Sequence, residues 1–270
     1  MPSVSSESVP ANSVSRDSPE RDYVQSLSRG LTVLQAFNAE RPAMTLADMA
    51  RATGLTRATA RRLLHTLVTL GYVCTDGRTF ELTPRVLDLG FAYVSSLQLP
   101  DIAQPFMEEL SDRVHESVSA SVLDGTQIVY VARVNTQRIM GISLAIGSRL
   151  PAAWTSMGRV LLAGLDDNAL DAFLEHLVVA GPTMQSITDV EALRCEIQSV
   201  RNQGFALIDQ ELEVGIRSVA APLRDRRGRT LAAVNVGTHA ARVTLKELRG
   251  VILPALLATA GSIEAQLAKR

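Results

Sequence analysis

Three arginines and a histidine recur on one side of a short predicted helix. Arg57 lies in its first turn, Arg61 and Arg62 lie one turn later, and His65 follows after another turn. The apolar side chains between them share the opposite face, at about 100° per residue. Residues 50–70 contain no acidic side chain. Guanidinium groups bind phosphate oxygens and base edges, so this spacing predicts a helix that enters the major groove of DNA.

The alternative for this stretch is an amphipathic surface helix whose arginines are merely solvated. Such a helix usually mixes charges of both signs, because opposite charges four residues apart stabilise it. Arg57 also opposes the helix dipole, an effect that a bound phosphate would offset. We therefore favour the DNA-binding interpretation. The residues expected to contact DNA are Thr45, Thr56, Arg57, Thr59, Arg61, Arg62, His65 and Arg78.

The residues around this helix predict a helix-turn-helix over residues 45–71. Thr45 and Asp48 have the spacing of a capping box at the start of a first helix. Gly54 can adopt the positive φ that a sharp helix stop requires. Thr56 can then cap the second helix, whose exposed side carries the arginines.

A hairpin is expected directly after the second helix. Two β-prone runs, residues 72–75 and 79–82, flank the sequence Asp76-Gly77-Arg78, and Asp-Gly is a strong hairpin signal. The hairpin would form a wing whose tip reaches a phosphate or the minor groove. Together with a helix expected over residues 26–37, the pattern predicts a winged helix-turn-helix domain over residues 23–83.

Length and charge indicate two domains of different character. A chain of 270 residues is too long for one winged-helix domain, so two domains are expected. Residues 21–90 carry nine Arg against six acidic residues, a net charge of +3, whereas residues 1–20 and 91–270 each carry −2. The positive charge therefore lies where DNA binding is predicted. Residues 1–22 have few large apolar side chains and are expected to form a disordered tail.

Other functional classes find little support in the sequence. Cys74 and Cys195 offer neither a disulfide framework nor metal-ligand spacing, so we expect no metal and no cofactor. The sequence has no Gly-x-Ser-x-Gly elbow and no phosphate-binding glycine loop, so no catalytic residue is assigned. An enzyme acting on a small carboxylic acid, with an accessory DNA-binding domain, is the alternative. Apolar runs long enough for a membrane span or a signal peptide are missing, so a cytoplasmic location is expected.

Residues 84–98 are expected to form a linker helix. Val86, Leu89 and Tyr93 lie on one side of it, which is more apolar surface than a free linker should show. Packing against the flanking domains is one explanation. We favour pairing with a second copy, which would set two winged helices at the spacing of a palindromic operator.

Residues 99–270 predict an α+β domain with a mainly antiparallel sheet, because short turns join consecutive strands. The expected strands are residues 117–123, 127–134, 139–144, 205–208, 218–223 and 231–236. The expected helices are residues 102–115, 158–165, 168–178, 190–203 and 245–268, the last interrupted at Pro254.

Three segments of this second domain could form a binding site. Residues 147–158 hold the only Trp and run into a helix start with two hydroxyls, which suits a carboxylate or phosphate ligand. Residues 209–218 form a polar loop between strands, and solvation explains their acids more simply than acid–base catalysis does. Asn235 is a lone amide in an apolar strand, where a bulge, a sheet edge or a ligand could account for it.

Several short motifs occur in one order along the chain. They are Ser28-Arg29-Gly30-Leu31, the helix-turn-helix, Leu82-Thr83-Pro84, Gly147-Ser148-Arg149-Leu150-Pro151, Thr155-Ser156-Met157-Gly158-Arg159, and Asp209-Gln210-Glu211-Leu212-Glu213 leading to Ser218. With these motifs, residues 24–265 resemble the IclR family of bacterial transcriptional regulators. Within that family the chain is most similar to the branch that controls aromatic-acid breakdown through protocatechuate, 4-hydroxybenzoate and β-ketoadipate.

The resemblance implies a regulator of double-stranded DNA whose GAF-like C-terminal domain binds a small carboxylate effector. It also implies homodimers that associate into tetramers on palindromic operators. The implied effector-binding residues are Arg138, Arg149, Trp154, Thr155, Ser156, Met157, Asp209, Ser218, Asn235 and Gly237. Some relatives carry Cys at the position of Ser218 and Ser at those of Asn235 and Gly237, which leaves the identity of the effector open.

Overall fold

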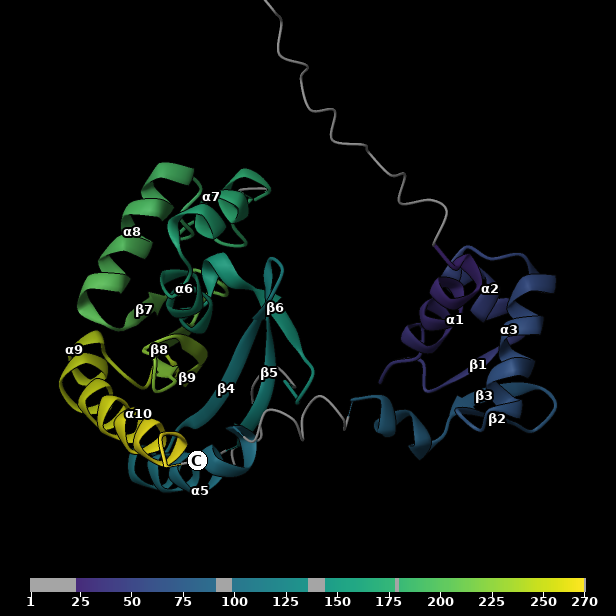
Figure 1. Cartoon of the computed structure of the whole chain (residues 1–270), viewed down its shortest axis with the longest axis horizontal. Coiled ribbons are helices and arrows are strands. Elements are labelled where there is room, and N and C mark those ends of the chain that lie inside the picture. The colour runs from purple at the N-terminus through teal and green to yellow at the C-terminus, as the bar shows by residue number, and fades with distance from the viewer. Residues whose placement is uncertain (1–22, 91–98, 136–143, 178–179, 270) are drawn as a thin grey trace, which may run out of the picture. The chain divides into compact units, whose positions relative to one another are not determined.

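The computed structural model describes residues 23–90, 99–135, 144–177 and 180–269. The chain divides into two compact units, Met1–Ala92 and Tyr93–Arg270 (Figure 1). The tail expected at residues 1–22, Arg138 and most of the strand expected at residues 139–144 lie outside the described residues.

The first unit is a winged helix-turn-helix, as predicted. Its elements are α1 Gln25–Gln35, β1 Ala43–Thr45, α2 Leu46–Thr53, α3 Arg57–Thr69, β2 Val73–Thr75 and β3 Thr79–Leu82. One core holds them together, and its central side chains Val33, Met49 and Leu64 have no exposed surface. Each of these three comes from a different helix, so the packing fixes α3 against α1 and α2.

The small sheet of this unit has the order β1-β3-β2, with both pairs antiparallel. The sequence predicted the β2–β3 hairpin but not β1, because three residues are too short to show an alternating pattern. Met44 of β1 is buried opposite Phe80 of β3. The extra strand therefore ties the wing to the start of α2.

The linker helix is described only in part. A 3₁₀ turn spans Pro84–Val86, residues 87–90 are helical, and the remainder of the predicted linker helix lies outside the described residues. The next helix, α5, spans Leu99–Val114. Pro100 lies in its first turn, where a missing N–H costs no hydrogen bond.

The second unit is built on a six-stranded antiparallel sheet, which confirms the predicted fold class. Its strands are β4 Ser117–Asp124, β5 Gln127–Val134, β6 Arg149–Pro151, β7 Ala206–Asp209, β8 Ile216–Arg224 and β9 Thr230–His239. Their order in the sheet is β6-β5-β4-β9-β8-β7. Strands from the two ends of the unit, β4 and β9, pair at its centre, an arrangement that periodicity alone does not predict.

Helices cover both faces of this sheet (Figure 1). The helix α5 and the C-terminal helix α10, Leu253–Leu267, pack on one face. The other face is covered by α6 Ser156–Ala163, with α7 Asp167–Glu175 and α8 Val190–Gln203 outside it. Along β9, Val234 and Val236 belong to the α5/α10 core and Ala233 belongs to the α6 core. Because side chains alternate along a strand, Asn235 and Gly237 therefore face α6.

The C-terminal helical segment has the predicted interruption. A short helix at Leu245–Glu247 passes into a π-helical turn, Leu248–Ile252, immediately before α10 begins. Pro254 lacks an N–H, and its ring clashes with the carbonyl four residues earlier, which explains the wider turn.

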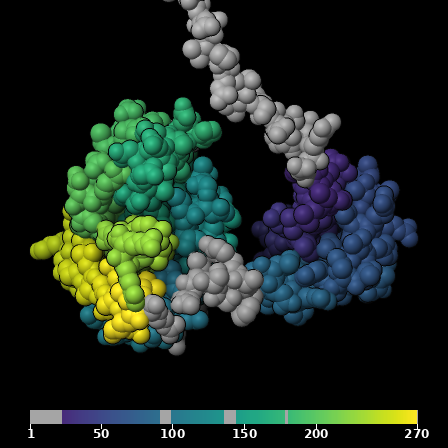
Figure 2. All heavy atoms as spheres, in the orientation of Figure 1, coloured from purple at the N-terminus to yellow at the C-terminus, as the bar shows by residue number. Residues whose placement is uncertain are grey.

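Leu245–Leu267 is long and apolar enough to cross a membrane, with a mean hydropathy of 1.4. Ile252, Leu256 and Ile263 are nevertheless buried against the sheet and α5. Figure 2 shows this segment, in yellow, on the outside of the second unit. One side of this segment therefore packs in the core of the second unit, and 28% of its apolar stretch is buried.

Candidate functional site

The exposed side of α3 carries the arginines, as the sequence predicted. Arg57, Arg61 and Arg62 are exposed, whereas Ala60 and Leu64 are buried in the unit's core. Within residues 23–90, none of these three arginines forms an ion pair. The helix thus presents uncompensated positive charge to solvent, as a phosphate-binding surface requires.

Thr45 and Thr56 are the N-caps of α2 and α3. Thr45 and Asp48 form the predicted capping box, and the Thr45 hydroxyl lies 2.7 Å from Asp48 Oδ2. Thr56 Oγ1 accepts a hydrogen bond from the Thr59 N–H at 3.2 Å, and the two hydroxyls lie 2.9 Å apart. These hydroxyls fix the turn between the helices, and Gly54 between them has φ 67°.

The wing presents Arg78 at its tip. Asp76 Oδ1 accepts hydrogen bonds from the N–H groups of Arg78 and Thr79, at 2.8 and 2.7 Å. These backbone donors hold the pKa of the Asp76 carboxyl below its usual value. His65 of α3 lies edge-on to Phe80 of β3, so it joins the wing to α3 while staying exposed. The Arg78 side chain is exposed and forms no ion pair with any described residue.

In the second unit, the glycine in the first turn of α6 lets the helix start lie against the preceding 3₁₀ turn, Ala152–Trp154. A Cβ on Gly158 would lie 2.0 Å from the Ala152 carbonyl oxygen, so no other residue fits there. Thr155 caps the helix, and its Oγ1 accepts a hydrogen bond from the Gly158 N–H at 3.1 Å. Ser156 and Met157 follow directly and are each 1% exposed. The start of α6 is therefore buried within the second unit.

Beneath α6 lies a set of polar side chains that we call the α6 polar cluster: Ser119, Arg133, Ser156, Ser218 and Asn235. Ser156 Oγ of α6 hydrogen-bonds to Ser218 Oγ of β8 at 2.8 Å. Ser119 of β4 lies directly opposite Asn235 of β9, and Arg133 of β5 lies opposite Ser119. The structure thus brings together Ser156, Ser218 and Asn235, which the resemblance implied, and adds two residues.

Asn235 and its neighbour Gly237 leave this cluster incomplete. Asn235 is 8% exposed, and its Oδ1 has no hydrogen-bond partner among the described residues. Gly237 pairs with Ser218 of β8, and a Cβ built on Gly237 would meet no atom within 4 Å. A buried acceptor without a partner, beside open space, requires an explanation such as a bound ligand or a water molecule.

Arg133 supplies the cation of the cluster. A β-bulge in β5 places Val131 and Ala132 in the α5/α10 core, so that Tyr130 and Arg133 both face α6. Arg133 Nη1 lies 3.5 Å from Ser119 Oγ, its Nε donates to Asn135 Oδ1 at 2.5 Å, and its guanidinium lies over the Tyr130 ring.

Burial lowers the pKa of the Arg133 guanidinium and raises the pKa of the Tyr130 hydroxyl. Arg133 forms no ion pair with any described residue. A half-buried cation without a carboxylate is free to bind one from a ligand.

A buried ion pair fixes the other side of α6. Arg159 is 1% exposed, and its guanidinium bonds to both carboxylate oxygens of Glu211, at 2.9 and 2.5 Å. Glu211 lies in the loop between β7 and β8, and its carbonyl oxygen accepts hydrogen bonds from Thr183 and Ser186. The pair therefore joins α6 to the loop that holds Glu211 and to the loop that holds Thr183 and Ser186.

The structure separates three of the expected effector-binding residues from the α6 polar cluster. Asp209 faces the opposite side of the sheet, where Arg217 bonds to it at 2.5 Å. Arg149 is exposed and pairs with Asp124 at the β4–β5 turn. Trp154 is buried, and its indole N–H donates to the Ile187 carbonyl at 3.0 Å, as a core residue would.

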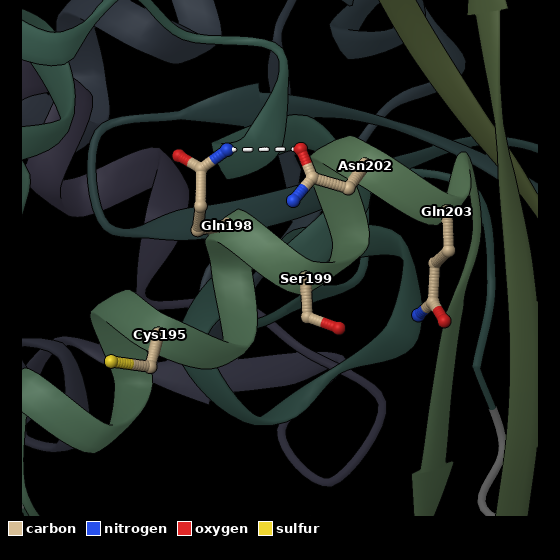
Figure 3. A pocket seen from close by; sticks show the side chains of 5 residues that line it. All are labelled: Cys195, Gln198, Ser199, Asn202 and Gln203. Atoms are coloured by element: carbon tan, nitrogen blue, oxygen red, sulfur yellow. Dashed lines mark hydrogen bonds between the residues drawn. The ribbon is translucent and has the colours of Figure 1, made fainter.

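Two hollows in the described surface lie away from the cluster. The larger, about 520 Å³, lies on the exposed side of α8 and is lined by Cys195, Gln198, Ser199, Asn202 and Gln203. In Figure 3 these five side chains come from one helix, and Gln198 donates to Asn202 at 3.2 Å. A depression along one helix surface offers a ligand little enclosure.

Sequence reasoning missed Arg133, Ser119 and the Arg159–Glu211 pair. Arg133 ends an apolar strand and Arg159 interrupts an apolar helix, and a charge in such a setting signals a paired or functional group. That signal was present in the sequence. The bulge that turns Arg133 toward α6 was not visible in it.

Comparison with known proteins agrees with this architecture. Residues 26–77 match the IclR helix-turn-helix domain, and residues 91–265 match the C-terminal domain of bacterial transcriptional regulator IclR. The chain is 44% identical over 259 residues to the Pca regulon regulatory protein of Pseudomonas putida, covering 96% of this chain and 89% of that protein. It is 35% identical over 247 residues to the p-hydroxybenzoate hydroxylase transcriptional activator of Acinetobacter baylyi, covering 90% and 91%.

A solved structure extends the similarity to the fold. An IclR homolog from Microbacterium hydrocarbonoxydans, crystallised with 4-hydroxybenzoate, has a TM-score of 0.78 and 26% identity, covering 90% of this chain and 98% of that one. The match includes both units, the winged helix-turn-helix and the antiparallel sheet with its helices. The chain belongs to the IclR family of bacterial transcriptional regulators.

Proposed function

We propose that this regulator binds a small carboxylate from aromatic-acid breakdown in the α6 polar cluster, and that this binding controls its occupancy of a palindromic operator. Arg133 carries the proposal, because its half-buried guanidinium has no carboxylate partner among the described residues. Ser119, Ser156 and Ser218 add hydroxyls around it. A ligand with a carboxylate and a small apolar body suits this site, because the polar cluster lies beneath α6 and Met157 of that helix is apolar.

The names of two similar proteins indicate which class of effector to test. One similar protein is named for activating p-hydroxybenzoate hydroxylase, and another was crystallised with 4-hydroxybenzoate. Both belong with this chain in a family whose members share the two-unit fold. We therefore propose an aromatic-acid catabolite as the effector, with protocatechuate, 4-hydroxybenzoate and β-ketoadipate as candidates.

A homodimer would present two recognition helices to a palindromic site. On the first unit, Leu27 and Leu31 of α1 are 63% and 47% exposed, and Leu87 and Leu89 of the linker are 74% and 52% exposed. Exposed leucines in such number favour burial against a second copy. A DNA-binding regulator of this kind would act in the cytoplasm.

Effector binding would control operator binding by changing the populations of different arrangements of the two winged helices. If the effector binds one arrangement of the two winged helices better than another, it stabilises that arrangement. A coupling free energy of about 1–3 kcal/mol would be typical of such a switch.

The test is a thermal-shift panel on the full chain with protocatechuate, 4-hydroxybenzoate, β-ketoadipate and short 2-oxo acids. We expect an aromatic-pathway acid to raise the melting temperature, because a ligand that binds only the native state stabilises it. The same acid should then change the affinity for an operator selected from a random-sequence DNA library, measured by gel shift.

Two results would contradict the proposal. Stabilisation by none of the acids would remove the effector assignment. Turnover of a stabilising acid, followed by mass spectrometry, would favour an enzyme with an accessory DNA-binding domain.

A further inference from the structure

The chain enters the linker at a point that is hydrogen-bonded to the segment following α3. Thr83, directly before the 3₁₀ turn Pro84–Val86, donates its N–H to the Tyr72 carbonyl oxygen at 2.9 Å. Its hydroxyl donates to the Gly71 carbonyl oxygen at 2.5 Å. Tyr72 is itself bonded to α3, because its N–H donates to the Leu67 carbonyl oxygen at 2.9 Å. The start of the linker is therefore attached to the end of the helix that carries the arginines.

Arg85 adds a side-chain contact at the same place. Its guanidinium carbon lies over the Tyr72 ring, 5.4 Å from the ring centroid, where the π electrons attract a cation. The Arg85 side chain also lies against Gly71, since a Cβ on that glycine would lie 3.2 Å from Arg85 Nη1. With the residues that the structure describes, Arg85 forms no ion pair. This cation is therefore held by an aromatic ring instead of a carboxylate.

The residues after Arg85 carry the leucines that we assign to the dimer interface. The Leu87 N–H donates to the Pro84 carbonyl oxygen, which keeps Leu87 in register with the 3₁₀ turn. Leu87 and Leu89 are 74% and 52% exposed. A continuous series of contacts thus leads from α3, through Tyr72 and Arg85, to the surface where a second copy would bind. The direction of α3 relative to that surface depends on these contacts.

We propose that Arg85 is a positioning residue for operator binding: its contact with Tyr72 fixes α3 relative to the linker and so restricts a dimer to one spacing of half-sites. This inference rests on the proposed homodimer on a palindromic operator. One base pair inserted between the half-sites shifts one of them by about 3.4 Å and rotates it by about 35° around the DNA axis. A dimer on the longer site must break the Tyr72–Arg85 contact or lose contacts with DNA.

The experiment measures the cost of a changed spacing, using the full chain and gel-shift titration. One duplex is the operator selected from the random-sequence library, and the other has one base pair inserted at its centre. The ratio of the two dissociation constants is the spacing penalty. We expect a penalty of at least about tenfold for the wild type, because the second recognition helix no longer meets its half-site.

Arg85→Met should reduce the spacing penalty by about fourfold or more. An exposed cation–π contact changes an equilibrium constant by about two- to fivefold, and a dimer contains two such contacts. Tyr72→Leu should have the same effect, and the double variant should add little to either single change, because both remove one contact.

Conservative changes and a matched control test the chemistry of the contact. Arg85→Lys keeps a cation and Tyr72→Phe keeps the ring, so both should retain most of the penalty. Arg41→Met removes another exposed arginine of the same unit and should leave the penalty unchanged. If Tyr72→Leu fails to fold, Arg85→Met still makes the test, because it changes only an exposed side chain.

The outcomes distinguish this inference from the proposed dimer and from a direct DNA contact. If Arg85 binds a phosphate, Arg85→Met weakens both duplexes by the same factor and lowers the salt dependence, and the unchanged penalty overturns the proposal. A penalty that persists in both Arg85→Met and Tyr72→Leu also overturns it and leaves the dimer on a palindromic operator in place. If the insertion costs the wild type nothing, the dimer with a fixed half-site spacing is contradicted as well.

Discussion

Arg159 and Glu211 lie 52 positions apart in the chain, and their side chains meet in a buried, two-point ion pair with N–O distances of 2.9 and 2.5 Å. The guanidinium also donates to the Ala153 carbonyl oxygen at 3.1 Å, just before α6. The Glu211 carboxylate accepts from the Ile187 N–H at 3.4 Å. This pair holds α6, the loop before β8 and the segment before α8 in one arrangement, and α6 carries Ser156 of the α6 polar cluster.

Removing one member of the pair should destabilise the second unit strongly. Arg159→Met leaves the Glu211 carboxylate buried without its cation, which costs about 3–5 kcal/mol. The free energy of unfolding, measured by urea denaturation, checks this. The double variant Arg159→Met with Glu211→Leu should recover much of the loss, because the one described carboxylate that then lacks Arg159 is that of Glu196, which is 34% exposed and lies 3.7 Å from Arg159.

The control for that experiment is Arg194→Met, which breaks an exposed pair with Asp171. Exposed pairs contribute about 0–1 kcal/mol, so this variant should unfold almost as the wild type does. A similar loss in both single variants would show that Arg159 acts through packing alone.

Arg62→Ala should weaken operator binding by about tenfold, because the exposed guanidinium of α3 would lose its contact to a base or phosphate. Gel-shift titration measures this effect. Arg227→Ala, an exposed arginine of the second unit, is the matched control and should change nothing. Unchanged binding by the Arg62 variant would contradict the assignment of α3 as the recognition helix.

Arg78→Ala tests the wing separately. If Arg78 contacts a phosphate, its loss should reduce the slope of log affinity against log salt concentration by about one. The preference between operator sequences should stay the same, because a phosphate contact carries no sequence information. A changed preference with an unchanged salt slope would assign the wing tip to base recognition instead.

Arg133→Met should lower effector affinity by about 10- to 100-fold, the loss expected for a charge-assisted hydrogen bond. Titration calorimetry gives the affinity. Arg149→Met is the control, because that arginine pairs with Asp124 outside the α6 polar cluster. Equal losses from both variants would indicate general electrostatic attraction rather than a carboxylate site at Arg133.

Ser156→Leu should abolish thermal stabilisation by the effector while operator binding stays intact. The larger side chain would fill the position where Ser156 Oγ meets Ser218 Oγ. Trp154, the only Trp of the chain, lies two residues before it, so its fluorescence reports binding directly. Loss of operator binding as well would mean that the substitution had damaged the fold.

The turn of the β2–β3 hairpin should become less stable at acidic pH. The folded-state pKa of Asp76 is held below its unfolded value, because its carboxylate accepts the N–H groups of Thr79 and Arg78. The stabilisation is therefore present above the unfolded pKa and is lost as pH falls through the folded pKa. An NMR pH titration of the Asp76 carboxyl and of the Arg78 and Thr79 amides should give one common midpoint. Asp76→Asn should remove that midpoint from the amides.

The amino-acid sequence by itself determined the local structure of this protein. The capping box at Thr45, the left-handed Gly54 and the Asp76-Gly77 turn are decided by a few neighbouring residues, and the structure has all three. The same holds for the α3 surface, because helical periodicity alone separates exposed Arg61 from buried Leu64.

Only the tertiary structure decided which residues meet beneath α6. The strand pairing of β4 with β9 brings Ser119 to Asn235, and a bulge in β5 turns Arg133 to the same face. The resemblance grouped Asp209 with Ser218 in one site, because both belong to the same polar segment of the sequence. In the structure the Asp209 side chain points to the other side of the sheet, where Arg217 binds it. Local residues set a backbone's turns and periods, whereas the partners of a polar side chain depend on register and twist across strands far apart in the chain.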